Sequence, residues 1–158
     1  MIRVGPIMAA IADAVRSNPA VGGFCEQYGR PLSLYVGHRA DQPLFAEANC
    51  PAFSVAPSEQ AYNIGRTGEA RTVPLTIRWA VWNEAAPEVD GVTTFSGVLD
   101  LDELGHLIIE AIRAMDIGDD LTSAEANFDT TASWPLCQAS AELTFTLARG
   151  TAYEPDYR

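Results

Sequence analysis

The clearest pattern in the chain is an alternation of apolar and polar residues after residue 71. Apolar side chains occupy every second position, and Thr72, Thr76 and Arg78 lie between them. This period of two predicts a β-strand with one buried face, and Pro74 within it indicates an edge strand or a bulge. The predicted buried face consists of Val73, Leu75, Ile77, Trp79 and Val81.

Two segments instead repeat their apolar residues at helical spacing. The first covers roughly residues 5–17 and opens with Pro6, which is tolerated in the first turn of a helix. The second follows Asp100, which we expect to cap the helix with Glu103 at the capping-box position, and it ends near Gly118. The apolar positions are Ile7, Met8, Ile11 and Val15 in the first segment and Leu101, Leu104, Ile108, Ala111, Ile112 and Met115 in the second.

Four further segments are typical of strands, at residues 32–36, 52–56, 121–131 and 138–149. The order of elements is then helix, two or three strands, helix and two strands. This order predicts an α+β fold in which a mostly antiparallel sheet has two main helices packed on one face. We expect one domain over residues 1–150 and a flexible C-terminal tail at 151–158.

Glycine and proline mark three connecting segments, at residues 22–31, 58–68 and 84–97. All three are predicted to be loops. The segment 58–68 shows no periodicity, and loops of this length in compact domains are often functional.

The length of 158 residues is that of one domain. No apolar run approaches the roughly 20 residues that span a membrane, and the N-terminus does not resemble a secretory signal, so we expect a soluble protein without a membrane partner. The cysteines, Cys25, Cys50 and Cys137, are three in number and isolated. They favour buried free thiols over disulfides or a zinc site.

Charge is distributed unevenly along the chain. The net charge is −11 and every basic residue is arginine, which argues against binding to a phosphate backbone. Residues 1–83 have a net charge of +1, residues 84–129 of −11 and residues 130–158 of −1. The acidic block, residues 84–129, is either a solvated face that keeps the protein soluble or a surface for a particular partner.

The sequence contains no recognisable catalytic or metal-binding pattern. His38 and His106 have no second histidine or cysteine at ligand spacing, and no nucleophile elbow, Walker loop or dinucleotide motif occurs. The acidic run at 116–120 lacks the spacing of a calcium loop. We therefore predict neither catalytic residues nor a metal or other cofactor.

Aromatic residues and one loop supply the candidates for a protein interface. Trp79 belongs to the predicted buried face, whereas Trp82 falls on the opposite face and is either core or interface. Trp134 precedes the last strand and has the same two interpretations. The candidate interface residues are Tyr62, Ile64, Arg66, Arg71, Trp82 and Trp134.

Most of the chain, about residues 5–149, resembles the tail terminator and minor tail proteins of long-tailed bacteriophages. The similarity consists of the order of elements together with Pro-Ala-Phe-Ser-Val-Ala-Pro at 51–57, the long loop at 58–68 and Glu-Ala-Ile-Arg at 110–113, which closes the second helix. Trp-Pro-Leu at 134–136, before a strand, is similar to some members.

This resemblance implies a structural protein of the virion tail that is made in the bacterial host cytoplasm and is not an enzyme. The subunit would form a homo-oligomeric, hexameric ring on the last ring of tail tube protein and bind the head-tail connector protein on its other face. DNA would pass through the ring without specific binding. Acidic side chains lining the lumen would repel its phosphates, and the candidates are Asp116, Asp119, Asp120 and Glu125.

A second hypothesis from another class is a small acidic binding module, of the inhibitor or immunity type, for a basic protein partner. Such a complex should weaken steeply as ionic strength rises, whereas a ring held by sheet and loop contacts should not.

Overall fold

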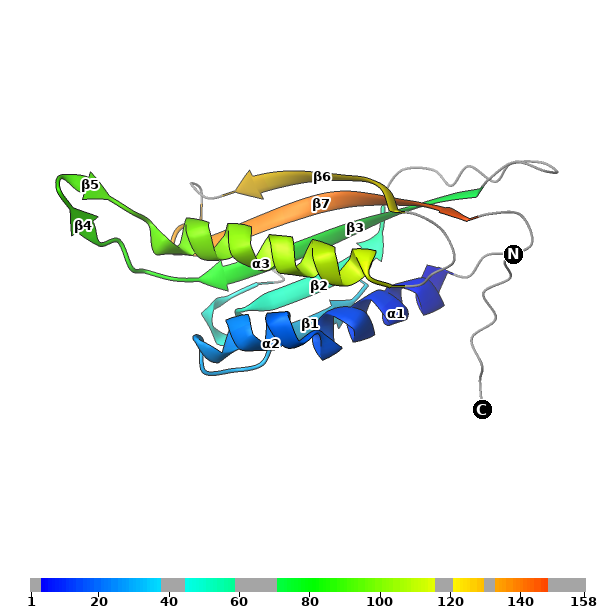
Figure 1. Ribbon diagram of the computed structural model, residues 1–158, viewed down its shortest axis with the longest axis horizontal. Coiled ribbons are helices and arrows are strands. Elements are labelled where there is room, and N and C mark those ends of the chain that lie inside the picture. The colour runs from blue at the N-terminus through cyan, green and yellow to red at the C-terminus, as the bar shows by residue number, and fades with distance from the viewer. Residues whose placement is uncertain (1–3, 38–44, 59–70, 116–120, 130–132, 148–158) are drawn as a thin grey trace.

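The computed structural model describes residues 4–37, 45–58, 71–115, 121–129 and 133–147. A five-stranded sheet forms one layer, and three helices form a second layer on one of its faces (Figure 1). The predicted α+β class is confirmed, with three helices in place of the two main helices expected.

The sheet has the strand order β1-β2-β3-β7-β6. β1 and β2 run parallel, and every other neighbouring pair is antiparallel. Each predicted strand segment has its counterpart in the sheet, with bounds that differ by a few residues. The strands are β1 Ser33–Val36, β2 Ala52–Pro57, β3 Arg71–Trp82, β6 Leu121–Asp129 and β7 Leu136–Leu147.

β3 is the central strand, so the prediction that Pro74 marks an edge strand is wrong. The Pro74 carbonyl accepts a hydrogen bond from the Ser58 N–H at 3.2 Å. In an antiparallel strand the carbonyl and the nitrogen of one residue point to the same side, so the Pro74 nitrogen, which has no hydrogen to donate, also points towards the β2 side. β2 ends at Pro57, opposite Leu75. The missing donor therefore lies past the end of β2 and removes no bond from its ladder.

The helices are α1 Val4–Ser17, α2 Pro19–Glu26 and α3 Ser96–Arg113. α1 agrees with the prediction, whereas α2 occupies a segment predicted as loop because of Gly22 and Gly23. The Asn18 side chain caps α2 by accepting bonds from two backbone N–H groups, and both glycines face solvent. None of the helices in the described part of the chain is long and apolar enough to cross a membrane.

α3 begins at Ser96, so the prediction that Asp100 caps this helix is wrong. Asp100 lies inside the helix, and its carboxylate accepts hydrogen bonds from the Tyr28 hydroxyl and the Asn83 amide. At the start of the helix, the Ser96 N–H donates to the Ala85 carbonyl at 3.0 Å, which ties the first helical residue to the segment that follows β3.

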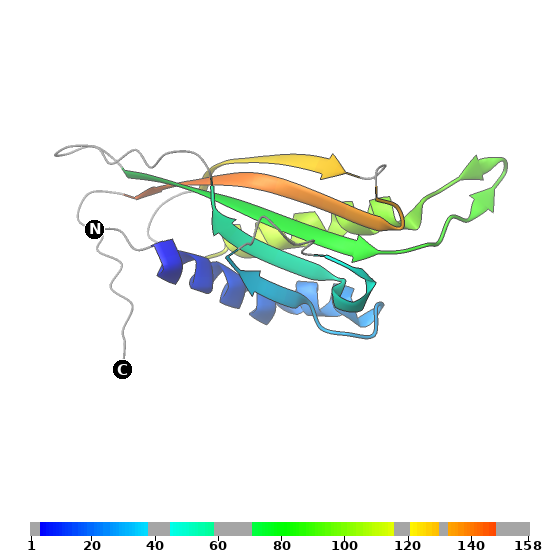
Figure 2. The same cartoon turned by 180° about the vertical axis from the view of Figure 1, so that it is seen from behind.

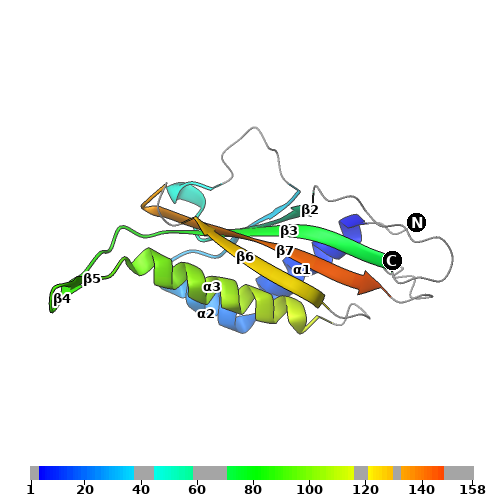
Figure 3. The ribbon, with the colours of Figure 1, turned by 90° about the horizontal axis from the view of Figure 1, so that it is seen from above.

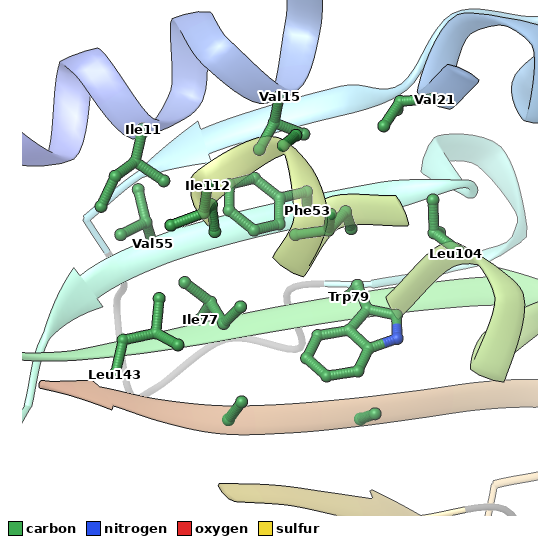
Figure 4. Packing of buried hydrophobic residues seen from close by; sticks show 14 of the residues in the cluster. Ile11, Val15, Val21, Phe53, Val55, Ile77, Trp79, Leu104, Ile112 and Leu143 are labelled. Carbon is green, nitrogen blue, oxygen red and sulfur yellow. The ribbon is translucent and has the colours of Figure 1, made fainter. Parts of the chain in front are cut away.

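The main core lies between the sheet and the helices (Figure 4). Trp79 is 1% exposed, as predicted, and its indole N–H donates to the Leu101 carbonyl at 2.9 Å. α3 can approach this ring because residue 105 is glycine. A Cβ atom on Gly105 would lie 2.6 Å from the nearest atom of the Trp79 ring.

A smaller cluster covers one end of the opposite sheet face. Phe45 and Cys50, which flank the short 3₁₀ helix η1 Glu47–Asn49, pack there on Ala52 and Ala80. Burial raises the pKa of the Cys50 thiol to about 11. All three cysteines are buried free thiols, as the sequence predicted.

Candidate assembly interface

A β-hairpin projects from the end of the molecule where β3 leads into α3 (Figures 1 and 2). It contains β4 Glu88–Val89 and β5 Val92–Thr93, which pair with each other in a sheet of their own. We call residues 84–95 the arm. The prediction of a plain loop at 84–97 is wrong, because this segment forms the arm and the start of α3.

The arm owes its shape to a two-residue turn at its tip. Asp90 and Gly91 have φ angles of 52° and 77°, the left-handed conformation that both central residues of a type I′ hairpin turn require. Towards the root, the Thr94 N–H donates to the Pro87 carbonyl at 2.9 Å. The arm is thus a regular ribbon that holds itself together through its own backbone.

Every residue of the arm is exposed to solvent. Val89 and Val92 lie directly opposite each other beside the turn, and they are 67% and 64% exposed. An isolated two-stranded hairpin is only marginally stable in water. The cross-strand pair of valines supports the hairpin and leaves apolar surface exposed at its tip.

The arm is also acidic. Glu84, Glu88 and Asp90 are its charged residues, and no arginine occurs between residues 84 and 95. The arm thus presents two valines among carboxylates, which favours a partner surface that is apolar and bordered by cations.

At the root of the arm, two half-exposed aromatic rings contact each other. Phe95 and Trp134 meet edge to face, with ring centroids 6.1 Å apart and an interplanar angle of 82°. Leu99, one helical turn after Phe95, is 61% exposed. We call Phe95, Leu99 and Trp134 the root patch. Exposed aromatic residues of this kind are enriched among the residues that contribute most to protein interfaces.

A part-buried polar network lies where the arm leaves the sheet. The Asn83 amide donates to the Asp100 carboxylate at 2.9 Å, and its carbonyl accepts from the Ala85 N–H at 2.9 Å. The Tyr28 hydroxyl donates to the same carboxylate oxygen. Burial, followed by the hydrogen bond to Asp100, raises the pKa of Tyr28. We call Tyr28, Asn83 and Asp100 the joint.

Two of the predicted interface residues, Trp82 and Trp134, have contacts in the described part of the chain. Trp134 belongs to the root patch. Trp82 lies on the sheet face opposite Trp79, as predicted, and packs against the small cluster around Phe45. Its indole nitrogen is buried, and no hydrogen-bond acceptor reaches it among the described residues. Trp82 is therefore mainly a core residue.

The other predicted interface residues lie elsewhere. Arg71 begins β3 at the end of the strand remote from the arm, opposite Leu147. Tyr62, Ile64 and Arg66 lie outside the described residues. The structure therefore does not bring the predicted interface set together, and only Trp134 joins the arm.

One of the predicted acidic residues lies in the sheet. Glu125 in β6 is opposite Glu142 in β7. One Glu142 carboxylate oxygen accepts a hydrogen bond from the Thr76 hydroxyl at 2.6 Å. Asp116, Asp119 and Asp120 lie outside the described residues.

Histidine and acidic side chains do not gather into a metal-binding cluster within the described ranges. His106 is exposed on α3, and His38 lies outside these ranges.

The fold is similar to a chain in a solved structure described as "Virion of native gene transfer agent (GTA) particle". The similarity has a TM-score of 0.54 at 14% sequence identity and covers 89% of this chain and 92% of the other. At this level of identity the similarity establishes a shared fold. No protein-family model and no curated protein matches the sequence.

The sequence contained a signal for the arm that the loop prediction did not use. Asp-Gly between two valines is a strong indicator of a hairpin with a two-residue turn. Phe95 and Leu99 were missed for a different reason, because their exposure depends on the start of α3 at Ser96 rather than after Asp100.

Proposed function

We propose that this chain is a structural protein of a phage-like particle that assembles with other virion proteins, and that it forms the ring that terminates the tail. The main support is the shared fold, which extends over nearly all of this chain and of the chain from the gene transfer agent virion. In this role the ring would cap the tail tube and bind the head connector.

The projecting arm supports an assembly role over a catalytic one. A cyclic, head-to-tail ring needs two different complementary surfaces on each subunit. The arm and its root patch supply one such surface, with exposed apolar residues at both the tip and the root. The joint, in contrast, is a set of polar groups that satisfy one another, so we propose for it a structural role and no catalytic activity.

The acidic residues fit the proposed ring through their charge. DNA that crosses a tail ring must not adhere to the wall, and carboxylates repel phosphates. We propose that Asp116, Asp119, Asp120 and Glu125 face the channel. Replacing the three aspartates by asparagine should leave the free energy of unfolding within about 0.5 kcal/mol and change DNA delivery by the particles.

The decisive experiment is deletion of the gene in the organism that produces the particles. A missing terminator should give tails of irregular length, or tails without heads, in negative-stain electron micrographs, and a plasmid copy should restore normal particles. Mass spectrometry of purified particles should detect the chain. Normal tails in the deletion strain, or particles that lack the chain in the parent strain, would contradict the proposal.

The three carboxylates of the arm also favour the second candidate, an acidic module that binds a basic protein. Affinity capture at low salt followed by a salt gradient separates the two hypotheses. A single basic partner released at moderate ionic strength supports the module, whereas recovery of tail proteins at high salt supports the terminator.

A further inference from the structure

A shallow groove lies on the helical side of the molecule, near the end that bears the arm. It has a volume of about 690 Å³ and is formed by the end of α1, by α2 and by the segment that leads into β1. Its lining includes Val21, Cys25, Pro31 and Leu32. Gly22 and Gly29 leave it open, because a Cβ atom at either position would have no neighbour within 4 Å.

The charged residues of the groove sit on its exposed rim. Arg30 donates to two backbone carbonyls of η1, Glu47–Asn49, so its guanidinium is held in place without losing its charge. Arg16 pairs with Asp13 at 2.6 Å, and Glu26 also lies on the rim. Asp13 and Glu26 offset the charges of the two arginines, so most of any binding energy must come from apolar contact.

The lining distinguishes this groove from a pocket for a small molecule. Its volume falls in the range of ligand sites, but such sites have polar groups that converge on the ligand from buried positions. Here the charged side chains, Arg16, Glu26 and Arg30, are all exposed. An open, apolar floor with a charged rim is suited to a segment of another protein.

We propose that the arm of one subunit docks into this groove on the next subunit, so that the tip valines contact the apolar floor and the carboxylates of the arm face the arginines on the rim. The inference rests on the proposed ring and identifies the two surfaces that join its subunits. The occupant of the groove is therefore a second copy of this chain.

Two observations support this pairing. The arm has an apolar tip among carboxylates, and the groove combines an apolar floor with Arg30, which forms no ion pair among the described residues. The arm also extends beyond the end of the molecule along its long axis and does not fold back onto its own groove (Figures 1 and 3). The two surfaces of one chain are thus both available to neighbours.

Filling the groove tests the receptor surface. Gly22→Trp should place a large ring in the groove without a clash at the backbone, since the Cβ position is open. Gly23→Trp is the matched control, because Gly23 is exposed in the same helix with equal space and does not line the groove. In native mass spectrometry of the full chain, Gly22→Trp should raise the Kd for self-association about tenfold or more, and Gly23→Trp should leave it near the wild-type value.

Removing the apolar tip tests the other surface. The double variant Val89→Ser with Val92→Ser keeps the Asp-Gly turn and should weaken self-association to the same extent. Mixing this double variant with Gly22→Trp gives the sharpest result. The double variant retains an intact groove, and Gly22→Trp retains an intact arm. The mixture should therefore form a one-to-one heterodimer, whereas each variant by itself should remain monomeric. Urea denaturation of each variant confirms that it is folded.

The inference is wrong if the wild-type chain remains monomeric at all concentrations, if Gly22→Trp and the double variant assemble like wild type, or if the mixture yields no heterodimer. The proposed function is judged separately by the particles. If the tails are regular and contain the chain, and Gly22→Trp assembles like wild type, the proposed tail function stands. Only the contact between arm and groove is then overturned. A chain that pairs through arm and groove but is absent from particles would overturn the tail role instead.

Discussion

The body and the arm of this protein use the same kinds of residue in opposite ways. In the body, the sheet and three helices bury most of their large apolar side chains, as Phe53 and Trp79 illustrate at 0% and 1% exposure. In the arm, Val89 and Val92 remain about two-thirds exposed although they sit in a regular ribbon. Secondary structure alone therefore does not explain the arm, whereas packing explains the body.

The contrast separates what the chain needs to fold from what it needs to assemble. Burial of apolar surface is the dominant favourable contribution to folding, and the body obtains it without the arm. In the proposed contact, the arm gains its burial from a neighbouring subunit. Substitutions in the two regions should consequently change different measurable quantities.

The largest effect is expected for Phe53→Ala. Phe53 is fully buried beneath the helices, so the change should lower the free energy of unfolding by about 3–5 kcal/mol, measured by urea denaturation. A decrease of less than about 1 kcal/mol in the free energy of unfolding would show that the body tolerates cavities. The body would then differ less from the arm in its dependence on packing.

Gly105→Ala should give the next largest effect. The added methyl group would lie 2.6 Å from the Trp79 ring, and overpacking of this kind costs about 1–3 kcal/mol. Gly23→Ala is the matched control, because its Cβ meets nothing within 4 Å and alanine favours a helix by up to about 1 kcal/mol. Equal stability of the two variants would contradict the close contact between α3 and Trp79.

Tyr28→Phe tests the joint that connects the two regions. Loss of the hydroxyl should cost about 0.5–1.5 kcal/mol at neutral pH. The folded state raises the pKa of Tyr28 above 10.0, so this stabilisation is complete below about pH 10 and decreases as the pH rises further.

Urea denaturation from neutral to alkaline pH measures this dependence. The wild-type protein should lose stability above about pH 10 more steeply than Tyr28→Phe. The control Tyr35→Phe, which removes a hydroxyl that accepts from Asn49, should retain the steep wild-type dependence. Parallel profiles for wild type and Tyr28→Phe would contradict the part-buried contact with Asp100.

The smallest change in folding is expected for Phe95→Ala. Phe95 is half-exposed and its main described contact is the Trp134 ring, so the free energy of unfolding should fall by no more than about 1 kcal/mol. Self-association measured by mass photometry should nevertheless weaken. If Phe95→Ala is strongly destabilised, or if it assembles like wild type, the root patch is not part of the interface.

The sequence predicted the body better than the arm for physical reasons. β3 and β7 alternate because one face of each is buried, and that period is visible without knowledge of the partners. α2 was missed because Gly22 and Gly23 disfavour a helix locally, while the Asn18 cap and the burial of Val21 and Phe24 stabilise it. Tertiary packing outweighs local propensity at such positions.

The interface was harder to predict because exposure depends on where a segment ends up in space. Trp82 and Trp134 are equally plausible anchors in the sequence, and only the fold packs Trp82 against Phe45 and leaves Trp134 beside Phe95. The charge of the arm was visible in the sequence, but its separation from the body follows from the joint.

In the proposed ring, the joint bears on the number of subunits. Tyr28 lies between the groove residues Glu26 and Gly29, and Asn83 is the last residue before the arm, so their shared partner Asp100 connects the two surfaces that we propose to join subunits. The angle between those surfaces sets the rotation from each subunit to the next, and a rotation that does not close produces an open helical filament. Three side chains would thus determine whether copies of this protein close into a ring of fixed size or continue to grow.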